Sequence, residues 1–326
     1  MNRRAVAVGA AIVVALVVLV VALTRGGGPG PSPGPTTAGT TATTPGPAPV
    51  PVPGWGDFPG APPDLRPPPG GSQSLTGSGG ARVLTIRRAD GTVLARAGVD
   101  RAGNALDARY FDRRGSLTVA VGGVRVSRGG AAAGGARVRC ASSARHDSGF
   151  RWTRFPIRWR LGSRRAPGMT AARALAALRR ARGTWNATRS HCRDIADRSR
   201  ARFAFVGPSA RATGRDGVNL VEFGDVNALG GVCVGTAACT ITFISGGRAV
   251  ESDTRIDRGR PGGFFTGRAR RGALDLQSVL VHESGHTLGF DHVLARSVVM
   301  FPAIAAGATG GRLLGRGDAL GSNRKY

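Results

Sequence analysis

The strongest constraint on this chain is an eleven-residue window, 282–292, that reads HESGHTLGFDH. His282 and His286 are four residues apart, so on a helix both imidazole rings project from the same face. This spacing suits two nitrogen ligands of a tetrahedral zinc ion, each about 2.0–2.1 Å from the metal. Gly289 allows the positive φ that ends a helix and turns the chain back, so that His292 can arrive as a third ligand. The window therefore predicts one zinc ion with a fourth position left open.

Glu283 follows the first of these histidines and is the candidate catalytic residue. Its carboxylate can act as general base toward a zinc-activated water without binding the metal itself. The preceding residues favour a helix, because Asp275 suits an N-cap and Leu276 and Val279 begin an apolar face. Single helical histidines are more often structural, but three of the five histidines and one of the three glutamates fall in this window. The pattern therefore predicts a hydrolytic zinc site.

The window resembles the signature of the metzincin metallopeptidases, H-E-x-x-H-x-x-G-x-x-H followed by a turn that contains a methionine. Met300, eight residues after His292, lies in the run S-V-V-M-F-P, which looks like this Met-turn. The spacing, with Asp291 before the last histidine, most resembles the matrixin branch and its bacterial members. The resemblance implies that Met300 forms the floor beneath the metal. It also implies that Phe301 and Pro302 border the pocket for the residue after the scissile bond.

For residues 138–326 the resemblance implies an α+β fold: a twisted, mostly parallel sheet, two long helices, a zinc cleft and a C-terminal helix. The expected elements are a strand at 155–159, a helix at 169–186, strands at 201–206 and 217–223, and a hairpin of 240–245 and 248–257. In matrixins the outer strand of this hairpin aligns the substrate.

Two departures from animal matrixins limit what the resemblance implies. The run D-T-R-I-D at 253–257 keeps its carboxylates, but Arg255 stands where a structural zinc ion would need a histidine. A second zinc ion is therefore unsupported, while a calcium ion at Asp253 or Asp257 and an ion pair of Arg255 with a neighbouring carboxylate are alternatives. The run R-C-A-S around Cys140 lacks the glycine and Pro-Asp of the family's pro-segment motif, so latency through this cysteine is not expected.

The cysteines are Cys140, Cys192, Cys233 and Cys239, an even number that favours two disulfides and allows three connectivities. The near pair Cys233 and Cys239 would close a glycine-rich loop. Cys140 and Cys192 would then join the start of the domain to the end of its first helix. The alternative is a free Cys140 that acts as an inhibitory zinc ligand.

The cellular compartment of this chain is predicted from residues 1–24. Arg3 and Arg4 precede an uncharged apolar stretch, 5–23, that would span about 28 Å as a helix, close to the thickness of a bilayer core. The end of this stretch is a poor cleavage site, so a membrane-inserted signal anchor is favoured over a removed signal peptide. The positive charge places the N-terminus in the cytoplasm and the remaining chain outside, where disulfides form.

Two further segments separate this predicted anchor from the peptidase domain. Residues 25–80 are rich in Pro, Gly, Thr and Ser and are expected to be a disordered linker. Residues 81–137 contain short alternating apolar runs, as at 83–86, 92–94 and 117–121, and are expected to be a small β-rich segment. Its role stays open between an independent module, a latency segment and an extension of the peptidase domain.

The charge balance limits the classes of partner that this chain is expected to bind. The 326 residues include 46 Lys plus Arg against 19 Asp plus Glu, a net charge of +27, and all but one of these bases (Lys325) are arginines. Arginines spread along the chain are not typical of a nucleic-acid-binding face, and no nucleic acid is expected outside the cell. Codon usage in a GC-rich genome explains them, with attraction to anionic envelope polymers or a membrane surface as the alternative. The oligomeric state is not indicated.

Together these features predict an extracytoplasmic zinc-dependent endopeptidase that acts on protein or peptide substrates. Two other classes stay open. One is a non-catalytic envelope-binding module with a structural or vestigial zinc site, and the other is a zinc-dependent peptidoglycan amidase or endopeptidase. Glu283 argues against the first, because a purely structural zinc site does not need this carboxylate.

Overall fold

The structure, a computed structural model, describes residues 65, 67–77, 82–100, 104–127 and 139–326. The chain divides into two compact units, residues 1–48 and 49–326, and every described residue belongs to the second. The predicted anchor, 1–24, and most of the predicted linker lie outside the described residues. Within the described ranges, no helix is long and apolar enough to cross a membrane.

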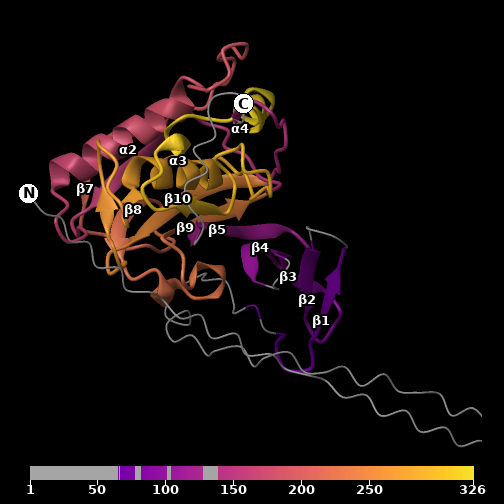
Figure 1. Cartoon of the computed structure of the whole chain (residues 1–326). Coiled ribbons are helices and arrows are strands. Elements are labelled where there is room, and N and C mark those ends of the chain that lie inside the picture. Colours follow the sequence, from indigo (N-terminus) through magenta and orange to yellow (C-terminus); the bar gives the residue numbers. More distant parts are fainter. Residues whose placement is uncertain (1–64, 66, 78–81, 101–103, 128–138) are drawn as a thin grey trace, which may run out of the picture. The chain divides into compact units, whose positions relative to one another are not determined.

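One mixed sheet of eleven strands organises the described residues (Figure 1). Its strand order is β1-β2-β3-β4-β5-β9-β10-β8-β6-β7, and β13 pairs with β5 outside this path. The strands are β1 (Ser72–Thr76), β2 (Arg82–Arg87), β3 (Val93–Val99), β4 (Ala105–Phe111), β5 (Leu117–Ser127), β6 (Ile157–Gly162), β7 (Phe203–Ser209), β8 (Asn219–Gly224), β9 (Ala238–Ser245), β10 (Arg248–Asp257) and β13 (Ala303–Ala305). The short strands β11 (Phe264–Phe265) and β12 (Leu274–Asp275) form a separate pair.

The two halves of the sheet differ in strand direction. Strands β7, β6, β8 and β10 are parallel to one another, and β9 joins β10 in an antiparallel hairpin. From β9 outward to β1, every neighbouring pair is antiparallel. The prediction of a mostly parallel sheet for residues 138–326 agrees with this first half. The sequence did not predict that five antiparallel strands, β1 to β5, extend the same sheet.

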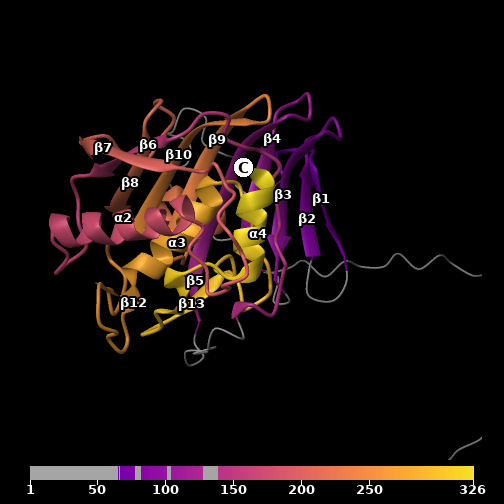
Figure 2. The same cartoon turned by 90° about the horizontal axis from the view of Figure 1, so that it is seen from above.

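Three helices are described: α2 (Ala171–Asn186), α3 (Leu276–Thr287) and α4 (Arg316–Lys325). Thr170 caps α2 by accepting the Arg173 backbone N–H, which explains why the helix starts two residues later than the sequence predicted. Helices α2 and α3 lie side by side over one face of the sheet (Figure 2). The indole N–H of Trp185 on α2 donates to the Val281 carbonyl on α3 at 2.8 Å, which fixes the two helices against each other.

The hydrophobic core has two parts, one on each face of the sheet. The larger lies between the sheet and helices α2 and α3 and includes the fully buried Trp159, Trp185 and Leu280. The smaller includes Ile86 of β2 and Phe243 of β9, together with residues of the short 3₁₀ turns η2 (Asn227–Leu229) and η3 (Gly231–Cys233). A third 3₁₀ turn, η4 (Gly310–Arg312), precedes α4.

The strands of the predicted β-rich segment belong to the same sheet as those of residues 139–326. Its apolar runs at 83–86, 92–94 and 117–121 fall in β2, β3 and β5. Strand β4 was not predicted, although its apolar residues alternate with Asp107 and Arg109, the pattern of a half-buried strand. Strand β1 falls within the range expected to be a disordered linker and differs from that expectation, since it pairs with β2 along its whole length. The pairing of β5 with β9 favours, among the three alternatives for this segment, an extension of the domain that follows it.

Both predicted disulfides are present. Cys140 is bonded to Cys192 and Cys233 to Cys239, and no cysteine is free. The alternative of a free Cys140 as an inhibitory zinc ligand is therefore wrong.

Candidate metal centre

Helix α3 carries His282, Glu283 and His286. Asp275 caps it as predicted, with its side chain accepting the Ser278 N–H at 3.0 Å. The helix ends at Thr287, and Gly289 follows with a φ of 81°. A Cβ at Gly289 would lie 2.9 Å from the Phe150 carbonyl oxygen, so glycine is required here both for its φ and for its size. This turn returns the chain and brings His292 to the two histidines of the helix.

The three histidine side chains converge on one point. Their Nε2 atoms form a triangle with sides of 3.0 Å from His282 to His286, 3.0 Å from His282 to His292 and 3.3 Å from His286 to His292. Within the described part of the chain, these three residues are the one group of His, Cys, Asp or Glu side chains close enough to share a metal ion. The structure therefore brings together all three predicted ligands.

The second nitrogen of each helical histidine fits metal binding. Nδ1 of His282 lies 2.6 Å from the Val299 carbonyl, and Nδ1 of His286 lies 2.8 Å from the Phe290 carbonyl. A carbonyl only accepts, so each Nδ1 carries the proton and each Nε2 presents a lone pair. Lone pairs facing each other at 3.0 Å repel unless a cation lies between them, and a zinc ion about 2.0 Å from each nitrogen fits this donor set.

Burial also favours the neutral, ligating form of these rings. His282 is fully buried and His286 nearly so. Burial, and secondarily the neighbouring histidines, hold the pKa of both side chains well below the usual range. Neutral imidazole is the form that binds a metal ion, so the pocket is preorganised for one.

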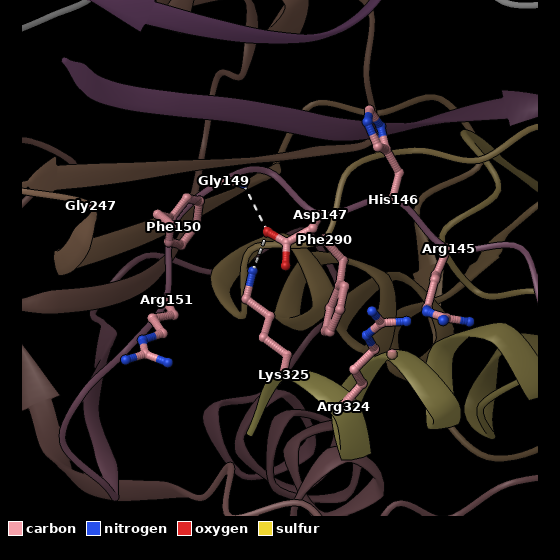
Figure 3. Close-up of a pocket in the computed structure, with 11 residues that line it drawn as sticks. Arg145, His146, Asp147, Gly149, Phe150, Arg151, Gly247, Phe290, Arg324 and Lys325 are labelled. Atoms are coloured by element: carbon pink, nitrogen blue, oxygen red, sulfur yellow. Dashed lines mark hydrogen bonds and ion pairs between the residues drawn. The ribbon is translucent and has the colours of Figure 1, made fainter.

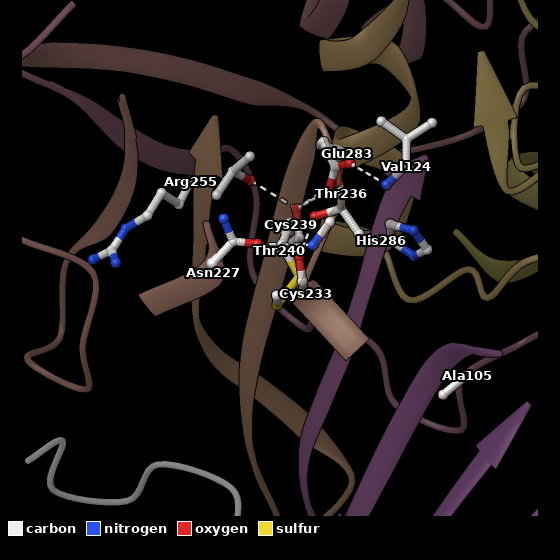
Figure 4. Close-up of a disulfide and its surroundings, with 12 residues drawn as sticks. Ala105, Val124, Asn227, Cys233, Thr236, Cys239, Thr240, Arg255, Glu283 and His286 are labelled. Carbon is white, nitrogen blue, oxygen red and sulfur yellow. Dashed lines mark hydrogen bonds between the residues drawn. A yellow bond between two sulfur atoms is a disulfide. The ribbon is translucent and has the colours of Figure 1, made fainter. Parts of the chain in front are cut away.

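Glu283 is buried beside this cluster, with two hydrogen bonds that fix its carboxylate (Figure 4). Oε2 accepts from the Thr240 hydroxyl of β9 at 2.7 Å, and Oε1 accepts from the Val124 backbone N–H of β5 at 3.1 Å. Burial raises the pKa of Glu283 to about 8, although both hydrogen bonds act to lower it. Cys239 lies next to Thr240 on β9 and is bonded to Cys233 of η3. The disulfide therefore ties the start of this strand to η3.

Sequence reasoning missed the groups that hold the third ligand. Asp107 Oδ2 on β4 accepts the His292 backbone N–H at 3.3 Å and lies 3.5 Å from its Nδ1, an ion-pair distance without hydrogen-bond geometry. The neighbouring Asp291 accepts Nε of Arg109, also on β4, at 3.0 Å and the Ser148 hydroxyl at 2.5 Å. Strand β4 lies far from the window in sequence, so no local pattern could reveal these contacts.

The predicted Met-turn lies directly under α3. Met300 is buried, and its sulfur packs against Gly285, where any Cβ would collide with it. Asp318 of α4 holds the turn by accepting the Val299 N–H at 2.8 Å and the Met300 N–H at 3.4 Å, and it also accepts the Gly315 N–H at 2.8 Å. Burial raises the pKa of Asp318 to about 6. This anchoring carboxylate was not predicted.

The two predicted pocket-wall residues lie beside β5. Pro302 is buried, and its carbonyl accepts the Arg125 N–H at 2.9 Å. Phe301 is half-buried beneath the guanidinium of Arg296 and lines a hollow of about 70 Å³ together with Val299.

Calcium, the alternative raised for residues 253–257, is not supported. The carboxylate of Asp253 accepts the backbone N–H groups of Gly214 at 2.9 Å and Leu220 at 2.8 Å. Arg255 pairs with Glu222 at 2.8 Å, which is the other alternative that the sequence left open. The acidic groups here are thus occupied by the protein's own donors.

A larger hollow, of about 670 Å³, lies elsewhere (Figure 3). Its lining includes Phe290, Arg324 and the Lys325–Asp147 ion pair of 2.7 Å, but neither Glu283 nor the three histidines. A smaller hollow of about 270 Å³ opens on His292 and is lined by β3 and β4. The volume of the larger hollow is therefore no guide to the candidate site.

Comparison with known proteins agrees with the site. Residues 226–326 match the matrixin peptidase family model, a range that contains α3, His292, the Met-turn and α4. The match supports a matrixin-like zinc metallopeptidase domain in this part of the chain. A search of curated proteins returned no match.

Proposed function

We propose that this chain, whose residues 226–326 match the matrixin family, is an extracytoplasmic zinc-dependent endopeptidase. The observation that carries the proposal is the position of Glu283, a buried carboxylate on the same helix as two of three converging histidines. A structural zinc site needs ligands only, whereas hydrolysis needs an open ligand position and an adjacent base. This site offers three ligands and such a base.

The proposed residue roles follow from the geometry. His282, His286 and His292 would hold a zinc ion, which when bound supplies Lewis acidity to the scissile carbonyl and to the attacking water. Glu283 takes the proton of that water on its carboxylate and delivers it to the leaving amide nitrogen. The Thr240 hydroxyl holds the Glu283 carboxylate in place through Oε2. Met300 supports the turn whose Val299 carbonyl fixes the His282 ring.

Location and substrate class are part of the proposal. Two disulfides support an oxidising compartment outside the cytoplasm. We propose that the segment 1–24 anchors the chain in the membrane, and that protein or peptide substrates are cleaved on the outer side. The net charge of +27 would favour substrates or envelope polymers that carry negative charge.

Replacing the base tests the proposal. We expect full-length Glu283→Gln to keep its zinc ion but to cleave a peptide library about 10²–10⁴-fold more slowly than the wild type, since it lacks a base. Glu251→Gln is the matched control, because Glu251 is also a buried glutamate but accepts the backbone N–H groups of Asp216 and Gly217 instead. Chelation should abolish cleavage and added zinc should restore it.

The same samples separate the other classes. Equal cleavage by Glu283→Gln and wild type at equal zinc content would refute the proposed mechanism. Zinc binding without any Glu283-dependent hydrolysis would favour the non-catalytic envelope module. Hydrolysis of purified cell wall but not of peptides would favour the peptidoglycan-directed enzyme.

A further inference from the structure

Strand β5 passes beside Glu283 and His286 and is paired with other strands on both sides. On one side it is antiparallel to β9, in a register from Val119 opposite Phe243 to Val124 opposite Ala238. On the other side its end is parallel to β13, from Arg125 opposite Ala303 to Ser127 opposite Ala305. Strand β9 belongs to the predicted hairpin whose outer strand aligns the substrate in matrixins. In this structure β5 already occupies its outer edge (Figure 2).

The centre of β5 lies against the predicted catalytic residues. Val124 donates its backbone N–H to Glu283 Oε1 at 3.1 Å, and its side chain is fully buried in the larger core (Figure 4). Two residues earlier, Gly122 packs against the His286 ring. A Cβ at Gly122 would lie 2.7 Å from Nδ1 and 2.8 Å from Nε2 of that ring. The backbone of β5 therefore covers a metal ligand and the base together.

Two consecutive glycines make this approach possible. A Cβ at Gly123 would lie 3.0 Å from the Cys239 Cα and 3.1 Å from its sulfur, tighter than most real contacts. Neither glycine has a positive φ. Glycine is therefore needed at both positions because a Cβ would not fit, and not because of the backbone conformation. A chain with larger side chains at these two positions could not lie so close to His286 and β9.

The hydrogen bond to Glu283 identifies which peptide bond of β5 faces the chemistry. A base that has taken a proton from water must return it to the leaving nitrogen, so the scissile N–H has to lie beside its carboxylate. In this structure the nitrogen in that place belongs to Val124. The Gly123–Val124 bond thus holds the position of a scissile bond.

Strand β4 fastens β5 in this place. Asp107 and Arg109 reach from β4 to His292 and Asp291, as described above. The Arg109–Asp291 pair joins the segment to the loop of the third ligand, and the Arg109 side chain is 25% exposed. This pair is therefore a point at which the segment can be loosened while Glu283, the three histidines and β5 keep their own side chains.

We propose that β5 is a built-in inhibitory strand that fills the cleft of the intact chain as a substrate would. Peptides enter only when residues 72–127 leave the site, and they then bind in the direction of β5, with small residues before the scissile bond and an aliphatic residue after it. The inference rests on the proposed peptidase function and adds its regulation and its substrate preference.

Two pairs of full-length variants test the proposal. Gly122→Ala places a methyl group against His286 and should expel β5, whereas Gly183→Ala makes the same change in α2 where nothing lies within 4 Å. Arg109→Ala removes the tie to Asp291, whereas Arg109→Lys keeps a positive charge there. The two Arg109 variants test the proposal independently if the Gly122→Ala chain does not fold.

The readouts are the affinity of the zinc-loaded chain for a peptide hydroxamate and the hydrolysis of a fluorogenic peptide. Hydroxamate binding needs an open cleft and a zinc ion but no turnover. We expect Gly122→Ala to bind at least about tenfold more tightly than the wild type, because affinity scales with the fraction of open molecules. Arg109→Ala should show a smaller gain, Arg109→Lys should gain less than Arg109→Ala because it keeps the charge, and Gly183→Ala should match the wild type.

Equal hydroxamate affinity of the wild type, Gly122→Ala and Arg109→Ala, at equal zinc content, would overturn the inhibitory role of β5. Tighter binding by Gly122→Ala without peptide hydrolysis would support that role and refute the proposed peptidase function instead. The two proposals can therefore fail separately.

Discussion

At the scale of single residues, the metal ligands could be read from the sequence because they lie in one short window. His282 and His286 are set by helical spacing, and Gly289 explains the return to His292. The groups that hold the ligands could not be read in this way. Asp107 accepts the His292 N–H although it lies 185 residues earlier in the chain. Such a long-range contact produces no local pattern in the sequence.

Arg182 is a second residue that only the structure explains. It is buried on α2 between the rings of Trp159 at 4.7 Å and Phe203 at 4.5 Å, and its Nε and Nη1 have no hydrogen-bond partner among the described residues. Burial lowers its pKa to about 9. The guanidinium is thus desolvated without an ion pair, although its aliphatic stem and the two rings still pack well.

We expect Arg182→Met to unfold at the same temperature as the wild type or higher. Methionine keeps the length of the side chain, and replacing a buried charge by an apolar group of similar size is often neutral or stabilising by about 1–4 kcal/mol. Arg182→Ala should instead lower stability, because it leaves a cavity. Calorimetric unfolding of the three chains checks this. A large loss of stability in Arg182→Met would mean that the charge itself is needed.

At the scale of elements, the helices and the β9–β10 hairpin follow the sequence closely. The hairpin was predicted at 240–245 and 248–257 and lies at Ala238–Ser245 and Arg248–Asp257. The Met-turn was also predicted, but its attachment to α4 was not. Asp318 makes that attachment through backbone N–H groups, and a hydrogen bond between distant segments cannot be inferred from spacing.

The raised pKa of Asp318 predicts a pH dependence of stability. Its pKa is about 6 in the folded chain and 3.8 by its ordinary value, so between these values the folded state holds a proton that the unfolded state has lost. The contribution of Asp318 to the free energy of unfolding must then fall as pH rises from about 4 to 6 and stay constant above about 7. Asp318→Asn lacks this group.

Urea unfolding at several pH values checks this sign. The stability of the wild type relative to Asp318→Asn should decrease from pH 4 to pH 7. An increase over that range would mean that the three backbone donors outweigh burial and that the carboxylate is ionised throughout.

At the scale of the whole molecule, the sequence predicted a peptidase domain and a β-rich segment but not their union in one sheet. The alternating runs of residues 81–137 indicate strands, yet they do not name the partner of each strand. The pairing of β5 with β9 joins segments more than a hundred residues apart. It depends on Gly122 fitting under His286 and on Gly123 fitting against Cys239. The sequence leaves the role of this segment open, and the pairing of β5 with β9 is the observation that bears most directly on it.

The central claim is that the three histidines hold a zinc ion beside Glu283, and zinc content measures it most directly. Native mass spectrometry of the full-length chain, purified without added chelator, should find one zinc ion per chain. Glu283→Gln should retain that ion, and His286→Ala should lose it or hold it far more weakly. A zinc-free wild type in zinc-containing buffer, or an equal zinc content in His286→Ala, would contradict the account.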